Sequence, residues 1–140
     1  MIKGVKINFN NLKFTKFHKN SIKLNFLNKN KLLKFNKFFL VCLSYSRLSI
    51  KQIEVARRAI VRYTQKFVFV KLNINPFFIF TKKSQKSRMG KGAGSINSLE
   101  FNLRPGIFIF ELISTSSIIS KNSFLKASNK LPGKYTIIKK

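Results

Sequence analysis

Acidic side chains are almost absent from this chain, and that shortage constrains it more than any other feature. Lys and Arg number 29 against 3 Asp and Glu, a formal net charge of +26 over 140 residues. A compact chain with this charge repels itself, so it is expected to need a polyanion as its partner. Nucleic acid or an anionic membrane surface could neutralise it, whereas a small acidic substrate could not.

The chain nevertheless has enough apolar residues for a packed core. Hydrophobic residues make up 44% of it and 16 are Phe, which argues against a merely disordered basic tail. The length suits one domain with a modest core. No apolar run reaches the roughly 18 residues that a membrane-spanning helix needs, so membrane insertion is not expected. The composition indicates a folded domain with a cationic surface.

Few side chains could support metal or acid–base chemistry. Cys42 and His18 are the single residues of their types, which leaves no intramolecular disulfide and makes metal binding by this chain alone improbable. The three acids are Glu54, Glu100 and Glu111, one on a predicted helix and two on predicted strands. General acid–base catalysis needs placed carboxylates or a placed histidine. We therefore expect no enzyme activity, no metal and no cofactor.

Residue usage also bears on the cellular compartment. Phe, Ile, Asn and Lys are abundant, whereas the chain has only 6 Gly and 3 Pro. The first group has A/T-rich codons and the second has G/C-rich codons, so the gene is predicted to be A/T-rich, as organelle genomes often are. The first residues also lack the Arg/Ser-rich amphipathic pattern of an import peptide. A protein made inside an organelle would fit both observations.

The clearest predicted helix spans residues 48–63. Ser49 and Gln52 form a capping-box pattern at its start, and Glu54 is placed to pair with Arg58 at i+4. One stripe of the helix is apolar, comprising Ile53, Ala56, Ile60 and Tyr63. The opposite side is basic and is either an ordinary solvated surface or an RNA-binding face; it comprises Lys51, Arg57, Arg58 and Arg62.

The remaining pattern predicts an α+β fold with a single domain over residues 39–140. Strands are expected at 66–72, 76–80 and 135–138, and a second helix at 116–131 with Phe124, Ala127 and Leu131 on one side. Residues 98–113 are predicted to form a hairpin around a type II turn at 104–106. The expected architecture is an antiparallel or mixed sheet with two helices packed on one face. A basic, extended N-terminal arm over residues 1–38 precedes it.

The stretch SRMGKGAGSIN at 87–97 raises the question of phosphate binding. It lacks the spacing of either nucleotide-binding glycine motif, and a strand rather than a helix is predicted to follow it. Glycines without side chains would let the backbone approach sugar-phosphate, with Arg88 and Lys91 supplying charge. A plain connection between strands is the alternative.

Several motifs in order carry a resemblance to a known family. The motifs are RRAIVRY at 57–63, RMGKGAG at 88–94, RPGIFIFEL at 104–112 and KLP at 130–132. They resemble the bacterial-type large-subunit ribosomal protein L-sixteen family, and the similarity covers most of the chain. It extends back through RLSIKQIE at 47–54 and faintly to KFTKFHKN at 13–20. Residues 21–44 match poorly, and Ala93 stands where the family usually has a second lysine.

The resemblance implies an α+β protein that binds large-subunit ribosomal RNA. It also implies that the glycine loop and the arm reach toward aminoacyl-tRNA near the peptidyl transferase centre. The loop residues are Arg88, Met89, Gly90, Lys91, Gly92 and Gly94. The arm residues are Lys13, Lys16, His18 and Lys19, although His18 is equally well an incidental residue. The residues expected to contact ribosomal RNA are Lys51, Arg57, Arg58, Arg62, Lys82, Lys83 and Lys86.

The sequence as a whole is interpreted as that of an organellar ribosomal protein without catalytic activity. Its expected partners are large-subunit rRNA, aminoacyl-tRNA and neighbouring ribosomal proteins, and no homo-oligomer is expected. The expected location is the mitochondrial matrix, within the mitochondrial ribosome, with the plastid as the alternative. Two rivals are a non-ribosomal basic architectural protein on nucleic acid and a protein bound to a membrane surface. The membrane rival would need a strongly amphipathic basic helix with a large aromatic face.

Overall fold

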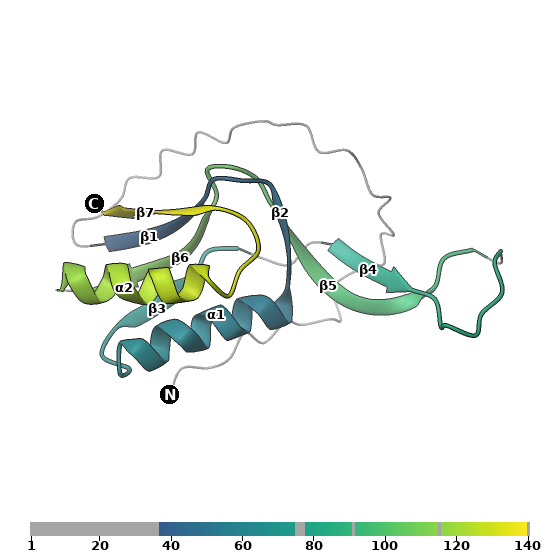
Figure 1. Ribbon diagram of the computed structural model, residues 1–140, viewed down its shortest axis with the longest axis horizontal. Helices are drawn as coiled ribbons and strands as arrows, with labels where there is room; N and C mark the ends of the chain where they lie inside the picture. Colours follow the sequence, from purple (N-terminus) through teal and green to yellow (C-terminus); the bar gives the residue numbers. More distant parts are fainter. Residues whose placement is uncertain (1–36, 75–77, 91, 115, 140) are drawn as a thin grey trace.

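The computed structural model describes residues 37–74, 78–90, 92–114 and 116–139 (Figure 1). The expected arm contacts Lys13, Lys16, His18 and Lys19, and the loop residue Lys91, lie outside the described residues. The chain runs through β1 (Lys37–Cys42), β2 (Ser46–Ser49), α1 (Ile50–Tyr63), β3 (Phe69–Leu72), β4 (Phe78–Lys82), β5 (Ser95–Leu103), β6 (Phe108–Ile113), α2 (Ser117–Ser128) and β7 (Tyr135–Lys139). This order of helices and strands confirms the α+β class.

The strands form two antiparallel sheets, where the sequence predicted one. The larger sheet has the order β3-β6-β1-β7 and the smaller has the order β2-β5-β4. Two of the strands, β1 and β2, were not predicted. Residues Lys37 and Phe38, assigned from sequence to the basic arm, begin β1.

The predicted hairpin over residues 98–113 is wrong, although its turn is present. Gly106 has φ +86°, and the N–H of Ile107 donates to the carbonyl of Arg104 at 3.3 Å, as a type II turn requires. The turn passes the chain from β5 in the small sheet to β6 in the large sheet. Strand β5 pairs with β2 over residues 100–103 and with β4 over residues 95–100, whereas β6 pairs with β1 and β3. The residues on the two sides of the turn therefore belong to different sheets.

The core lies between the large sheet and the two helices, which pack against each other (Figure 1). Strand β1 contributes Phe38 and Leu40, opposite Leu112 and Phe110 of β6. The helices contribute the residues that their periodicity predicted: Ile53, Ala56, Ile60, Phe124, Ala127 and the following Leu131. Each large apolar side chain buried here contributes about 1.5–3 kcal/mol. Cys42 is fully buried among them, as expected of a small apolar residue.

Local hydrogen bonds fix both ends of α1. At its start the N–H of Gln52 donates to Ser49 Oγ, and the N–H of Ser49 donates to Gln52 Oε1, which confirms the predicted capping box. At its end the N–H of Lys66 donates to the carbonyl of Val61, and that of Gln65 donates to Arg62, the Schellman pattern. Because this turn includes Lys66, β3 begins at Phe69 and not at residue 66 as predicted.

The small sheet projects from the body of the molecule (Figure 1). We call β4, the loop 83–94 and the first part of β5 (residues 95–98) the projection. Burial changes along β5: Ser95, Ile96 and Asn97 are exposed, whereas Leu99, Phe101 and Leu103 are buried. The strand thus leaves the core as it enters the projection. None of the helices in the described ranges is long and apolar enough to cross a bilayer.

Candidate nucleic-acid interface

The glycine loop 87–94 closes the hairpin of β4 and β5 at the end of the projection (Figure 1). Gly90 has φ +98° and Gly92 has φ +78°, and a Cβ added at either would meet no heavy atom within 4 Å. Their missing side chains are therefore needed for backbone conformation and not for space inside the chain. Both glycines are exposed. The backbone at this tip is open to a partner.

Gly94 serves a different purpose. A Cβ placed there would lie 2.5 Å from the carbonyl carbon and oxygen of Lys82. Glycine at this position allows β4 and β5 to approach each other where the loop begins. The close contact that requires glycine here is with the Lys82 backbone, and the approach to sugar-phosphate stays a prediction.

Cations are spread along the projection. Lys82, Lys86 and Arg88 are exposed, and Lys83 is half-buried and donates from Nζ to the carbonyl of Gly90. No acidic residue occurs between β4 and Leu99. The positive charge of the projection is thus not neutralised by its own residues.

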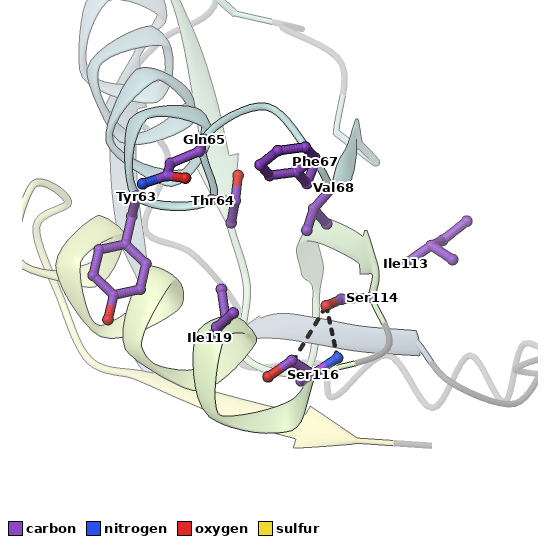
Figure 2. Close-up of a pocket in the computed structure, with 9 residues that line it drawn as sticks. All are labelled: Tyr63, Thr64, Gln65, Phe67, Val68, Ile113, Ser114, Ser116 and Ile119. Carbon is purple, nitrogen blue, oxygen red and sulfur yellow. Dashed lines mark hydrogen bonds between the residues drawn. The ribbon is translucent and has the colours of Figure 1, made fainter.

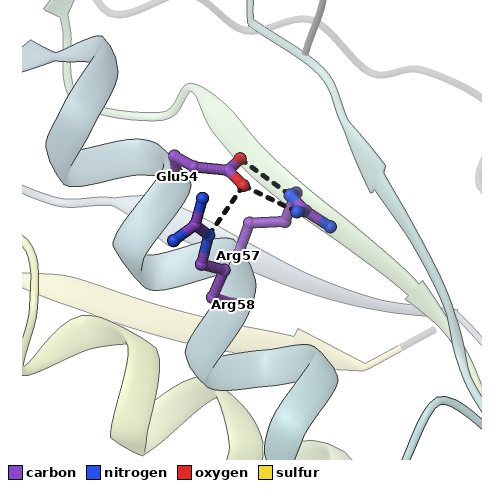
Figure 3. Close-up of polar contacts among 3 residues, drawn as sticks. All are labelled: Glu54, Arg57 and Arg58. Carbon is purple, nitrogen blue, oxygen red and sulfur yellow. Dashed lines mark hydrogen bonds and ion pairs between the residues drawn. The ribbon is translucent and has the colours of Figure 1, made fainter. Parts of the chain in front are cut away.

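On the basic side of α1, Glu54 lies between Arg57 and Arg58 and accepts hydrogen bonds from both (Figure 3). Arg57 donates to both Glu54 oxygens, from Nε at 2.8 Å and from Nη2 at 2.7 Å. Arg58 Nε donates to Glu54 Oε1 at 3.1 Å, which confirms the predicted i+4 pair. The hydrogen bonds from Arg57, followed by those from Arg58, hold the pKa of Glu54 below its ordinary value.

The two arginines differ in their availability to a partner. The side chain of Arg57 is 14% exposed and that of Arg58 is 72% exposed. Lys51 and Arg62 are exposed as well. Arg57 and Arg58 both pair with Glu54, but only Arg57 is largely buried in doing so; Lys51, Arg58 and Arg62 remain exposed to solvent.

The structure therefore places the predicted contacts on two separate surfaces. Lys82, Lys83, Lys86 and the glycine loop lie on the projection, and the α1 residues lie on the body (Figure 1). Sequence reasoning missed two exposed arginines, Arg47 on β2 and Arg104 in the turn after β5. Both lie near Tyr45, whose pKa is raised by burial against the opposing effect of their positive charges. Their positions inside the motifs RLSIKQIE and RPGIFIFEL were the available signal.

Nothing in the described ranges resembles a metal centre or a nucleophilic site. No group of three or more His, Cys, Asp or Glu side chains occurs among these residues in a position to hold a metal. Cys42 is fully buried and its Sγ donates to the carbonyl of Ser44 at 2.7 Å. Burial raises the pKa of the Cys42 thiol, which disfavours the reactive thiolate.

The fold and its basic projection define an α+β protein with an electropositive surface that its own acids do not offset. Residues 9–138 match the model of the family described as ribosomal protein L16p/L10e. The chain belongs to that family.

Individual relatives agree with the family match. The chain is 38% identical over 105 residues to large ribosomal subunit protein uL16 of Sulfurihydrogenibium sp. (strain YO3AOP1), covering 75% of this chain and 76% of that protein. It is 34% identical over 120 residues to large ribosomal subunit protein uL16 of Carsonella ruddii (strain PV), with 86% and 88% covered. The protein of that name from Blochmanniella pennsylvanica (strain BPEN) is 34% identical over 126 residues, with 90% and 92% covered.

Membership of this family fixes the broad role. The chain is a structural, non-enzymatic constituent of the large ribosomal subunit and takes part in translation. The family implies ribosomal RNA and other ribosomal proteins as its partners. The expected absence of catalysis agrees with this assignment.

Proposed function

We propose that this protein binds large-subunit ribosomal RNA through its cationic surfaces and uses the projection to help position aminoacyl-tRNA near the peptidyl transferase centre. The observation that carries the proposal is the projection itself, which extends from the body and bears exposed cations without an acid. The glycines at its tip leave the backbone free for close approach to sugar-phosphate. The body, with its buried core, would anchor the protein in the subunit.

The proposed setting is the mitochondrial ribosome in the matrix, with the plastid ribosome as the alternative. Support comes from the residue usage, which is typical of an A/T-rich gene. We further propose that a single copy works in each subunit.

The membrane-surface alternative is disfavoured by the use of α1 in the core. Its apolar stripe, Ile53, Ala56 and Ile60, is 2% exposed or less. An interfacial helix must bury that stripe in lipid. The stripe is already occupied by the sheet and by α2, so the helix has no apolar face to offer a membrane.

The salt dependence of RNA binding tests the electrostatic part of the proposal. Contacts between Lys or Arg and phosphate release counterions, so neutralising about six to ten phosphates should lower affinity by orders of magnitude over a few-fold rise in salt. The measurement is the affinity of the full-length protein for a large-subunit rRNA fragment at several salt concentrations. A nearly flat profile would contradict the proposal.

The glycine loop is tested by Gly92→Val in reconstituted large subunits. Valine cannot readily adopt the left-handed backbone of Gly92, so the tip should change shape while the body stays folded. We expect normal incorporation and a loss of aminoacyl-tRNA binding and peptide-bond formation, with a milder effect of Lys91→Ala.

Ala93→Val is the matched control, because it adds the same branched side chain to the same loop at a residue without positive φ. It should retain most tRNA binding. Normal translation by Gly92→Val subunits would show that the loop is only a connection. Failure of Gly92→Val to enter the subunit would assign the loop to assembly instead.

A further inference from the structure

A cavity lies between the C-terminal end of α1 and the N-terminal end of α2, at the opposite end of the molecule from the projection (Figure 1). It has a volume of about 530 Å³. Thr64 and Phe67 lie on one side of it, and Ile119 and the hydrogen-bonded pair Ser114 and Ser116 lie on the other (Figure 2). None of its lining residues belongs to the two cationic surfaces described above.

An uncommon backbone presents Phe67 at the mouth of this cavity. Gln65 has φ +48° and Lys66 has φ +68°, values that residues with a side chain seldom adopt. The N–H of Lys66 donates to the carbonyl of Val61 at 3.2 Å, and the N–H of Phe67 donates to Thr64 at 3.0 Å. These bonds hold the strained turn in place. As a result the Phe67 side chain is 88% exposed beside a cavity, where an apolar ring would ordinarily be covered.

The lining of the cavity combines apolar and hydrogen-bonding groups. Phe67, Val68 and Ile119 supply apolar surface. Gln65 presents an exposed side-chain amide, and the Ser116 hydroxyl makes no capping hydrogen bond to α2. An apolar protein segment would cover such groups without satisfying them, at a cost in binding free energy. A ligand with flat apolar faces and a polar edge fits this mixture better.

The charge around the cavity favours an anionic partner. Lys66 is exposed next to Phe67, and Lys126 Nζ lies 4.3 Å from the centre of the Tyr63 ring, which lines the cavity. None of the lining residues is acidic. Glu111 comes two residues before Ile113 in β6, but it is buried and paired with Lys37.

We propose that this cavity takes an unpaired nucleobase of RNA, stacked on Phe67, with the adjoining phosphates near Lys66 and Lys126. Splayed-out bases of single-stranded RNA are commonly recognised by stacking on aromatic side chains and by hydrogen bonds to their edges. Gln65 and Ser116 supply the edge contacts. The inference rests on the proposed function, because it takes RNA as the partner, and it adds a second kind of contact to the electrostatic one.

The test compares single-stranded and duplex RNA as probes of the full-length protein. The probes are a fluorescein-labelled ten-nucleotide mixed-sequence RNA and the same strand annealed to its complement, with affinity measured by anisotropy at fixed salt. Phe67→Ala should weaken single-strand binding about tenfold, because one base stack of about 1.4 kcal/mol corresponds to that factor. Duplex binding should change less than twofold. Phe67→Tyr should restore single-strand binding.

Phe69→Ala is the matched control, since Phe69 is a 64%-exposed phenylalanine two residues further on that does not line the cavity. It should leave both affinities unchanged. Equal loss for Phe67→Ala and Phe69→Ala, or equal loss on both RNAs, would overturn the base-stacking site. So would unchanged single-strand binding by Phe67→Ala.

Two further measurements separate this inference from its alternatives. Sedimentation velocity without RNA should give the same species for wild type and Phe67→Ala; dissociation of a dimer by the substitution would assign the surface to a second copy instead. Salt-sensitive binding of single-stranded RNA by Phe67→Ala with the same affinity as wild type would leave the proposed function intact and overturn the cavity alone. Weak, salt-insensitive binding by the wild type would overturn the proposed function as well.

Discussion

The body and the projection share one continuous strand, β5, but different interactions stabilise them. In β5 the residues Leu99, Phe101 and Leu103 are at most 3% exposed, whereas Ile96, a few residues earlier, is 48% exposed. The body is held by apolar burial between a sheet and two helices. The projection is held by the strand pairing of β4 with β5 and by glycines that shape its tip. Substitutions should therefore affect stability in the body and function in the projection.

Charge follows the same division. All three acids lie outside the projection, and two of them, Glu54 and Glu111, form ion pairs within the body. The body thus neutralises part of its own charge where the chain packs, and the projection leaves its charge for a partner.

The largest effect is expected for Phe110→Ala in the body. Phe110 is 0% exposed in the centre of the core, and removing so large a buried ring should cost about 3–5 kcal/mol of unfolding free energy. Ile96→Ala in the projection should cost less than about 0.5 kcal/mol. Urea denaturation followed by circular dichroism measures both. Similar losses for the two variants would erase the distinction between the regions.

Gly94→Ala should produce the next largest effect, confined to the projection. The added Cβ would press on the Lys82 backbone, so β4 and β5 must separate, at a cost of about 1–3 kcal/mol. Gly90→Ala meets nothing within 4 Å and carries only the penalty of its backbone angle, about 1–2 kcal/mol. Amide hydrogen exchange should show faster exchange in β4 and β5 for Gly94→Ala, with the body unchanged. Faster exchange in β1 and β6 would mean that the regions are coupled.

Glu111→Gln should destabilise the body in a pH-dependent way. Glu111 is 8% exposed and accepts hydrogen bonds from Lys37 and Asn73, and the bond from Lys37 is the main reason that its pKa is lowered. A carboxyl with a lowered folded-state pKa contributes stability above its unfolded pKa of about 4.3 and loses it as pH falls through the folded value. At pH 7 we expect a loss of about 1–2 kcal/mol.

The difference between wild type and Glu111→Gln should shrink as the pH is lowered from 5 to 3, measured by denaturation across that range. Glu54→Gln, whose side chain is 23% exposed against 10% for Glu111 and which is shared with the exposed Arg58, should show a smaller difference with the same direction. A difference for Glu111→Gln that stays constant with pH would show that the ion pair does not contribute to folding stability.

The smallest expected effect is a gain. Gln65, at the end of α1, has a left-handed backbone conformation that glycine adopts with less strain. Gln65→Gly should therefore raise the unfolding free energy by about 0.5–1 kcal/mol. Gln85→Gly, an exposed glutamine of the projection without positive φ, should give no gain. Thermal unfolding of both variants checks this, and an unchanged or lower melting temperature for Gln65→Gly would argue against strain at that turn.

Some features followed from short stretches of sequence. The capping box at Ser49, the apolar stripe of α1, the second helix and the type II turn at Gly106 are all present. Gly90 and Gly92 of the glycine loop also have a positive φ, which glycine adopts without strain. Each depends on residues within a few positions of one another, where spacing and glycine placement are sufficient. The run FFLVCL at 38–43 also carried the signal of a buried strand, which periodicity alone does not distinguish from a buried helix.

The sequence predicted which residues give the candidate site its positive charge, but not all of the contacts that those residues make within the protein. The sequence indicated which basic residues face away from the core, and Lys51, Arg58 and Arg62 do so. It did not show that Arg57 makes two hydrogen bonds to Glu54, because i+3 and i+4 partners compete for the same carboxylate. The cavity beside Phe67 was also hidden, since it forms where two helix ends meet.

The sequence by itself determined the charge, the capping box at the start of α1 and the turn that separates β5 from β6, because these depend on composition and on near neighbours. Only the tertiary structure decided which strands pair. Strand β6 pairs with β1, more than sixty residues earlier, and β5 pairs with β2 and β4. Backbone hydrogen bonds are the same for every sequence, so the choice of neighbour depends on which arrangement buries the apolar faces together. That arrangement also leaves β4 and the loop outside the core, available to a partner.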